Sequence, residues 1–346
     1  MSLQKFIIAI KRTLKRNNMS LYIRLLLLFL LVILFSGLTM ILGPASFSFQ
    51  DLSGIWHGES LDPFISKVLF ELRLPRVFAA LLTGTALSVA GLSLQSVFRN
   101  PLAGPFVLGI SSGASLGVAL ILLAGFSYGA LGLFPAAALG AFAVTLVVLA
   151  LSRLFDSPAM LLVVGLMISY IVDAFVTLLM HFSNAEALRS YVAWGMGSFS
   201  RLTLQDVPTF LIAVLLGLTL IILSMRYLNA VRLGDDFAKG LGLSVRTYRT
   251  LVLFGASILT AASTVYCGPV AFLGLAVPHI AFALFRTTNH RILVPASILI
   301  GMSLSLCVGL FSQVPLNAMM SLFGVPVVFW VLFASRYKAR GGPFGS

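Results

Sequence analysis

Long apolar stretches dominate this chain and limit what it can fold into. Hydrophobic residues make up 59% of the 346 positions and charged residues only 10%, and the mean hydropathy is +1.06. A helix that crosses the hydrocarbon core of a bilayer needs about 20 mostly apolar residues, and it has to satisfy its backbone hydrogen bonds internally. These values exclude an ordinary soluble domain and predict an all-α, polytopic membrane protein.

We predict about ten transmembrane helices, with boundaries uncertain by about 4 residues. They cover residues 21–43, 76–97, 104–125, 131–153, 158–180, 208–227, 248–267, 270–286, 292–312 and 316–335. With both chain ends in the cytoplasm, roughly 18 of the 23 Lys and Arg residues lie on the cytoplasmic side, as the positive-inside rule requires. The domains are then a basic cytoplasmic N-terminus (1–20), a single transmembrane domain (21–336) and a flexible C-terminal tail (337–346).

Several function classes are excluded by what the sequence does not contain. The two cysteines, Cys267 and Cys307, lie in apolar surroundings without metal-ligand spacing, so neither a disulfide framework nor a metal site is predicted. The net charge is +13, but no basic stripe interleaved with aromatic residues occurs, so we predict no nucleic-acid partner. The positive charge is better explained by the protein's location in a lipid bilayer. No nucleotide-binding loop or hydrolase motif occurs, and the chain is not expected to be an enzyme.

A polar loop over residues 233–249 separates two long apolar runs. Its charged side chains cannot lie in hydrocarbon, so the loop faces water. Residues Asp235 to Lys239 are predicted to form a short helix with its acids at the start, where they suit the helix dipole, and Gly240 and Gly242 end it. The loop is either a docking surface or an ordinary cytoplasmic connection.

Small residues recur at helical spacing in the second and third spans. They are Gly84, Ser88 and Gly91 in one and Gly109, Gly113 and Gly117 in the other. Such residues let helix backbones approach closely in lipid, so we expect a compact bundle. Between the two spans, Pro101 prevents helix continuation and predicts a tight cytoplasmic turn.

Four ionisable residues at or within the bilayer are candidate functional groups. Asp173 lies inside the fifth span and is either a functional carboxylate or a hydrogen-bonded structural acid. His279 lies in a Gly- and Pro-interrupted span, where a packing role competes with a role in a transport pathway. Arg73 and Arg76 lie at the outer mouth of the second span, where simple interfacial arginines are the alternative.

Several segments together resemble the permease family of ABC importers for iron-siderophores, haem and cobalamin. They are RLPRVFAALLTGTALSVAG, RNPLAGPFVLGISSGASLG, the 233–249 loop, CGPVAFLGLAVPHIAF and FGVPVVFWVLF, in the order expected for that family. The resemblance covers roughly residues 60–335. It departs from the family at Gln313-Val314-Pro315, which is short and carries no acid.

The resemblance implies a homodimer in the bacterial inner membrane, with two cytoplasmic ATPases beneath it and a periplasmic or lipid-anchored substrate-binding protein outside. ATP and Mg²⁺ are then bound by the ATPases, and this chain needs no cofactor. The implied site residues fall into four groups. They are the ATPase-coupling residues Gly234, Asp235, Asp236, Ala238, Lys239, Gly240, Leu241 and Gly242; the inner-gate residues Asn100, Pro101, Leu102, Ser157 and Pro158; the docking residues Arg73 and Arg76; and the pathway lining of the fifth span and its outer helix, including Trp194. We add Met167, Asp173 and His279 to the pathway residues, although Asp173 stands where related sequences usually have a small or weakly polar residue.

Two other classes stay open on sequence grounds. An ion-gradient-driven secondary transporter would use Asp173 as its proton carrier and would need no ATPase. A purely structural membrane scaffold would carry no flux. The sequence does not choose among iron-siderophore, haem and cobalamin as cargo.

Overall fold

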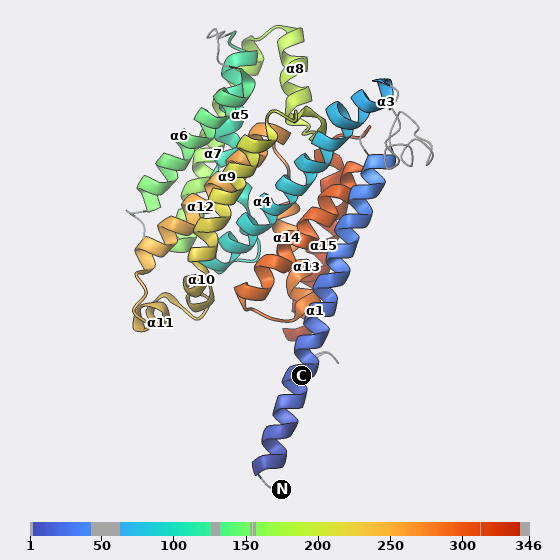
Figure 1. The fold of residues 1–346 in the computed structure, drawn as a ribbon. Coiled ribbons are helices and arrows are strands. Elements are labelled where there is room, and N and C mark those ends of the chain that lie inside the picture. Colours follow the sequence, from blue (N-terminus) through green and yellow to red (C-terminus); the bar gives the residue numbers. More distant parts are fainter. Residues whose placement is uncertain are drawn as a thin grey trace.

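The computed structural model describes residues 3–42, 63–125, 132–152, 154, 157–311 and 313–339, and the regular structure of these residues is entirely helical (Figure 1). The α-helices are α1 (Leu3–Ile41), α3 (Pro63–Lys67), α4 (Leu74–Phe98), α5 (Ile110–Leu122), α6 (Leu133–Ser152), α7 (Pro158–Phe182), α8 (Ala185–Gly195), α9 (Val207–Leu223), α10 (Met225–Val231), α11 (Asp235–Gly240), α12 (Val245–Cys267), α13 (Leu273–Phe285), α14 (His290–Gly309) and α15 (Leu316–Ala339). Three short helices of other types are η1 (Val68–Arg73), η2 (Pro105–Leu108) and η3 (Phe199–Arg201). The predicted all-α class is confirmed.

Helix length and composition support a protein that crosses the membrane several times. Among the described residues, six helical stretches are long and apolar enough to span, and α9 with α10, bent by 54°, adds a seventh. Shorter apolar helices, α5, α13 and the Leu316–Phe329 part of α15, lie at the three remaining predicted positions. The spans predicted to start at residues 104 and 270 begin later as α-helices, because η2 and a non-helical stretch precede them.

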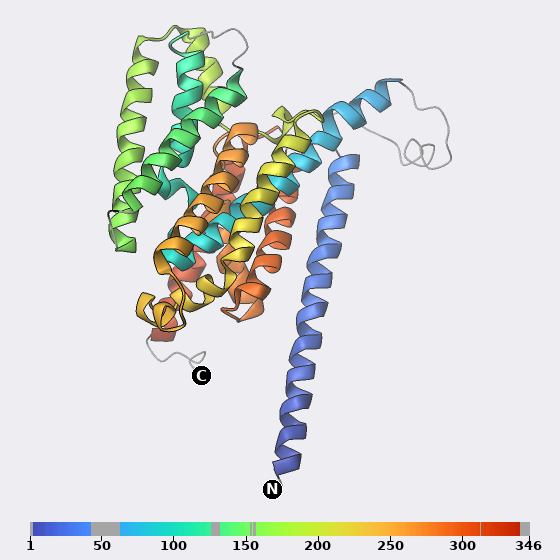
Figure 2. The same cartoon turned by 60° about the vertical axis from the view of Figure 1, so that its left-hand side comes forward.

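Helix α4 forms the centre of the bundle. Every residue from Leu82 to Phe98 is buried, and the helix packs against α14, α12, α13 and α9. Both views show it running obliquely through the middle of the molecule (Figures 1 and 2). A helix that is apolar or small on all its faces is suited to burial on all sides, which explains this central place.

Close backbone approaches join α4 to its neighbours. A Cβ atom added to Gly84 would lie 2.5 Å from the carbonyl oxygen of Gly301 in α14, and one added to Gly91 would overlap the backbone of Gly274 in α13. Helices α5 and α6 meet in the same way at Gly113. The predicted small-residue packing of the second and third spans is therefore confirmed.

The first helix lies at the edge of the bundle, opposite α6 and α7 (Figure 2). Only Val32 and Thr39 are buried among its described side chains, and Arg24 donates a hydrogen bond to the Leu284 carbonyl at the end of α13. The predicted N-terminal segment 1–20 is helical from Leu3 and continuous with the first span. In the predicted tail, residues 337–339 belong to α15 and residues 340–346 lie outside the described residues.

The contact between α4 and α13 generates a stability prediction. In the Gly91→Ala variant the new methyl group collides with the backbone of Gly274, which cannot move aside as a flexible side chain could. We therefore expect a loss of about 1 to 3 kcal/mol of stability, the usual cost of overpacking. The matched control is Gly37→Ala in α1, where no atom lies within 4 Å of the added Cβ. Thermal unfolding of both purified variants in detergent measures the difference, and equal melting temperatures would contradict the close approach.

Candidate functional site: helix α11 and the turn after α4

Helix α11 is the short polar helix that the 233–249 loop predicts, and it lies at the opposite end of the bundle from α8 (Figure 1). Asp235 and Asp236 occupy its first turn, where the free backbone N–H groups favour negative charge. The backbone turns through left-handed conformations at Gly234 (φ 117°) and Gly242 (φ 76°), which glycine adopts without strain. Gly240 is instead the last residue of α11, outside that conformation and with open space around it.

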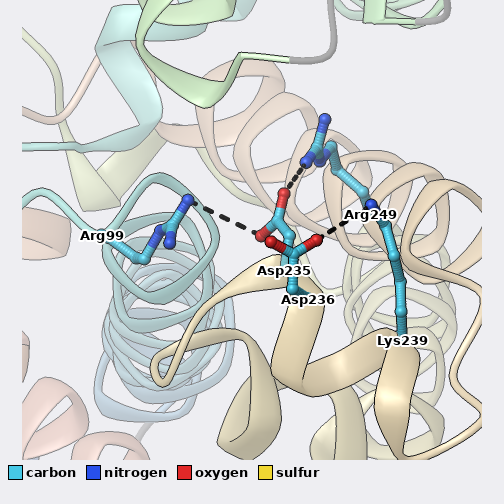
Figure 3. Close-up of polar contacts among 5 residues, drawn as sticks. All are labelled: Arg99, Asp235, Asp236, Lys239 and Arg249. Atoms are coloured by element: carbon cyan, nitrogen blue, oxygen red, sulfur yellow. Dashed lines mark hydrogen bonds and ion pairs between the residues drawn. The ribbon is translucent and has the colours of Figure 1, made fainter.

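Asp235 links α11 to two other parts of the bundle (Figure 3). Its Oδ2 atom accepts a 2.8 Å hydrogen bond from Nη2 of Arg249 in α12. Its Oδ1 atom lies 3.6 Å from Nη2 of Arg99, the residue that ends α4. The Arg249 side chain is 8% exposed and the Asp235 side chain 22%, so water screens this contact less than an ordinary surface ion pair. We call these three residues the Asp235 junction.

The outer face of α11 is built differently from this inward side. The Asp236 side chain is 99% exposed, and among the described residues its ion-pair partner is Lys239 of the same helix, 3.3 Å away. Phe237 and Leu241 are also exposed, whereas Ala238 is fully buried against the bundle. The helix therefore presents charged and apolar groups outward and anchors itself through Asp235 and Ala238.

A second buried contact holds the segment that leads into α11. His290, at the start of α14, is fully buried. Its backbone N–H and its Nδ1–H both donate to Oδ1 of Asn229 in α10, at 2.9 and 2.8 Å. With that tautomer, the unprotonated Nε2 lies 2.7 Å from the Ser96 hydroxyl of α4, which also contacts the Leu92 carbonyl at 2.9 Å. Helix α10 is thus tied to the ends of α4 and α14 just before α11 begins.

The predicted inner turn follows Arg99, which ends α4 in a left-handed conformation (φ 48°). Asn100 Oδ1 accepts a 2.9 Å hydrogen bond from the Leu102 N–H and closes the turn. The Pro101 carbonyl accepts a hydrogen bond of 2.9 Å from Nε2 of His279 in α13. The structure therefore brings together Pro101, predicted at the gate, and His279, predicted along the pathway.

The second predicted gate segment begins α7. Ser157 is exposed at the N-terminal boundary of this helix, Pro158 is its first residue, and the side chain of Pro158 lies outside the described residues. Helix α7 packs against η2, which closely follows the inner turn. The contact between α7 and the region after the inner turn includes Gly165 and Ser169, which face Gly109.

The four predicted pathway residues do not converge on one cavity of this chain. Met167 and Asp173 lie on an exposed face of α7. Trp194 is buried in the core and stacks on Tyr191 of α8, and His279 is held by the inner turn. Burial raises the pKa of the Tyr191 hydroxyl, a hydrogen bond with Ser115 lowers it, and the nearby negative charge of Asp173 raises it.

The two outer arginines have different environments, although the sequence predicted one shared role. Arg73 is 3% exposed, and its guanidinium donates to the carbonyls of Met40 and Ile41 at the end of α1. Arg76 is half-buried, and its Nε donates to the Ser200 hydroxyl at 3.0 Å. Arg73 therefore fastens α1 to the bundle, and Arg76 is the more accessible cation of the pair.

Sequence reasoning missed the partners that define this site. Arg249 is the last residue of the 233–249 loop and Arg99 precedes the turn at Pro101, but no spacing rule connects either of them to Asp235. His290 and Asn229 gave no signal beyond their place near helix ends. Among the described residues, no group of three or more His, Cys, Asp or Glu side chains is placed to hold a metal ion.

Comparison with known proteins identifies similar chains. The FecCD transport family matches residues 25–334. The hemin transport system permease protein HmuU of Yersinia pestis is 35% identical over 330 residues, covering 91% of this chain and 96% of that protein. The vitamin B12 import system permease protein BtuC of Klebsiella pneumoniae is 34% identical over 292 residues, covering 81% and 86%. An inward-facing structure of an ABC transporter assigned to the metal-chelate type matches with TM-score 0.79 and 32% identity, covering 90% and 98%.

The Asp235 junction predicts unequal effects of removing two cations. Arg249→Met leaves the largely buried Asp235 carboxylate without its 2.8 Å partner, and we expect a loss of about 1 to 3 kcal/mol of stability after allowing for its partial exposure and for Arg99. Lys239→Met removes a solvent-exposed ion pair and should leave the stability unchanged within measurement error. Thermal unfolding in detergent measures both variants, and an unchanged melting temperature of Arg249→Met would show that the junction does not stabilise the protein.

Proposed function

The chain belongs to the FecCD transport family, and from that membership we infer that it is the membrane permease of an ATP-driven importer. Its helices provide the path through the bilayer, while separate ATPase subunits bind ATP and Mg²⁺ and hydrolyse the nucleotide. A multi-span helical bundle with one short polar helix at its end suits this division of labour. The permease itself then carries out no covalent step.

The observation that carries this proposal is the construction of α11. Its outer face presents Asp236, Phe237, Lys239 and Leu241 to solvent, a mixture of charge and apolar surface suited to a protein partner. Its inner side is bonded to the bundle through Asp235. A helix built in this way can receive a displacement from an ATPase and pass it to the transmembrane helices, which tilt as rigid bodies between two discrete arrangements.

The inner gate in this proposal is formed by the turn Asn100 to Leu102 together with Ser157 and Pro158 at the start of α7. Leu102 is 45% exposed and projects from a turn that is closed by its own hydrogen bonds. An apolar side chain on a rigid turn is suited to closing a path against a symmetry-related copy of itself.

We further propose ten spans with both ends in the cytoplasm and a homodimer around a central path. This topology counts α5, α13 and α15 as spans besides the longer helices. The exposed face of α7, with Tyr170 72% and Met167 59% exposed, is available to line a path between two copies. Trp194 and His279 then support that lining from behind, because both are buried within one chain.

The cargo proposed is a large metal chelate or macrocycle, such as an iron-siderophore, haem or cobalamin. The apolar side chains of α7 favour a large and mostly apolar molecule. The names of HmuU and BtuC, which refer to hemin and to vitamin B12, support the same class. Asp173 beside Tyr191 provides a polar contact along this face.

An ATP-driven importer and an ion-coupled transporter make opposite predictions in proteoliposomes. We expect uptake only when the cognate ATPase subunits and ATP are present, and we expect Asp236→Lys to weaken co-purification of the ATPase by about tenfold or more through an unfavourable charge at the interface. Uptake that follows a proton gradient without ATP, and that Asp173→Asn abolishes, would instead establish the ion-coupled alternative.

The outer end predicts a docking residue for the binding protein. Arg76→Glu should weaken capture of the cargo-loaded binding protein, more strongly at low salt because exposed charges are then less screened. The control is Lys67→Glu, which changes the net charge equally at an exposed position of α3. Surface plasmon resonance at two salt concentrations measures the affinity of both variants for the binding protein. Equal losses of affinity would show that only the change in net charge matters and that Arg76 has no specific role.

A further inference from the structure

We propose that the Asp235 junction connects α11 mechanically to the inner gate, with Arg99 as the positioning residue of the gate turn. This inference rests on the proposed function and assigns different tasks to the two acids of α11. Asp236 faces the ATPase, whereas Asp235 passes the displacement of the helix to the turn after α4. Figure 3 shows this arrangement, with Arg99 approaching Asp235 from one side and Arg249 from the other.

The two ion pairs of Asp235 differ in a way that suits a connection. The contact with Arg249 is a direct hydrogen bond of 2.8 Å made by a buried guanidinium, so α11 is held firmly on the start of α12. The contact with Arg99 is longer, 3.6 Å, and the Arg99 side chain is 42% exposed. Asp235 Oδ1 is buried and accepts no hydrogen bond from any described protein group. A relative movement of roughly half an ångström would convert this ion pair into a hydrogen bond.

The backbone of Arg99 gives the second argument. A non-glycine residue in the left-handed conformation is uncommon and costs conformational energy, and glycine would fit φ 48° better. The ion pair with Asp235 is a contact that glycine at this position could not make. Because Arg99 immediately precedes Asn100, a displaced guanidinium also displaces the first peptide of the gate turn.

The same turn is held from the other side by a different helix. His279 of α13 donates to the Pro101 carbonyl at 2.9 Å, while Asp235 holds Arg99 two residues earlier. The turn thus lies between a contact that moves with α11 and a contact that moves with α13. A change in the position of α11 relative to α13 reorients the turn, and this is the movement that opens or closes the inner gate.

The test compares two arginines that share one backbone geometry. Arg99 ends α4 and Arg286 ends α13, both with φ 48°, and Arg286 is exposed and forms no ion pair with a described acidic residue. Changing each arginine to glycine removes a guanidinium without straining the helix end. The complex with the ATPase is reconstituted in proteoliposomes, and uptake and ATP hydrolysis are measured together.

In the Arg99→Gly complex we expect uptake per ATP hydrolysed to fall about five- to tenfold, the lower range of typical coupling between sites. Co-purification of the ATPase should be unchanged. Arg99→Lys should recover most of the coupling because it restores the cation. Arg286→Gly should behave like the unmodified complex. Asp235→Asn should lose at least as much coupling as Arg99→Gly, because it also weakens the 2.8 Å contact with Arg249. The double variant should be no worse than Asp235→Asn alone, since both changes break the same connection to Arg99.

Two results would overturn the inference. One is an Arg99→Gly complex with normal uptake per ATP, and the other is an Asp235→Asn complex that loses its ATPase, which would make Asp235 a docking residue like Asp236. Failure of the proposed function has a different signature. In that case the unmodified complex itself shows no ATP-dependent uptake.

Discussion

The close packing of α4 against its neighbours is the constraint on which the rest of the molecule depends. In a bilayer, burial of apolar surface does not drive helices together, so association relies on backbone approach and van der Waals packing. The paired glycines of α4 with α13 and α14 allow that approach. Because every residue from Leu82 to Phe98 is buried, we treat α4 as a rigid helix whose two ends are fixed relative to the surrounding helices.

Each end of this helix carries a different kind of polar contact. At one end Arg73 binds the terminal carbonyls of α1 and Arg76 reaches Ser200. At the other end Arg99 meets Asp235 of α11, and Ser96 meets His290. In the proposed function, a binding protein outside and an ATPase inside act on the two ends of the same central helix. An importer needs such an arrangement, because binding on one side has to be coupled to opening on the other.

The sequence predicted the general class of the site better than its connections. The short helix from Asp235, the turn at Pro101 and the close helix contacts were expected from local patterns, and the structure contains all three. Arg73 was grouped with Arg76 because they are neighbours in the chain, but the structure separates their environments. Trp194 was placed along a pathway and is instead buried within the chain. Whether a side chain on a helix faces solvent or a neighbour depends on packing that one helix does not specify.

The sequence by itself determined that this chain spans a membrane and that the 233–249 loop lies in water. Both follow from the cost of placing charge or unpaired backbone in hydrocarbon, a cost that each segment incurs independently of the others. Only the tertiary structure decided that Asp235 joins Arg99 to Arg249 and that His279 holds Pro101. These residues are far apart in the chain, and their meeting depends on how α4, α11, α12 and α13 pack together. That packing arises from the shapes of whole helices, which no local pattern of charge or hydrophobicity records.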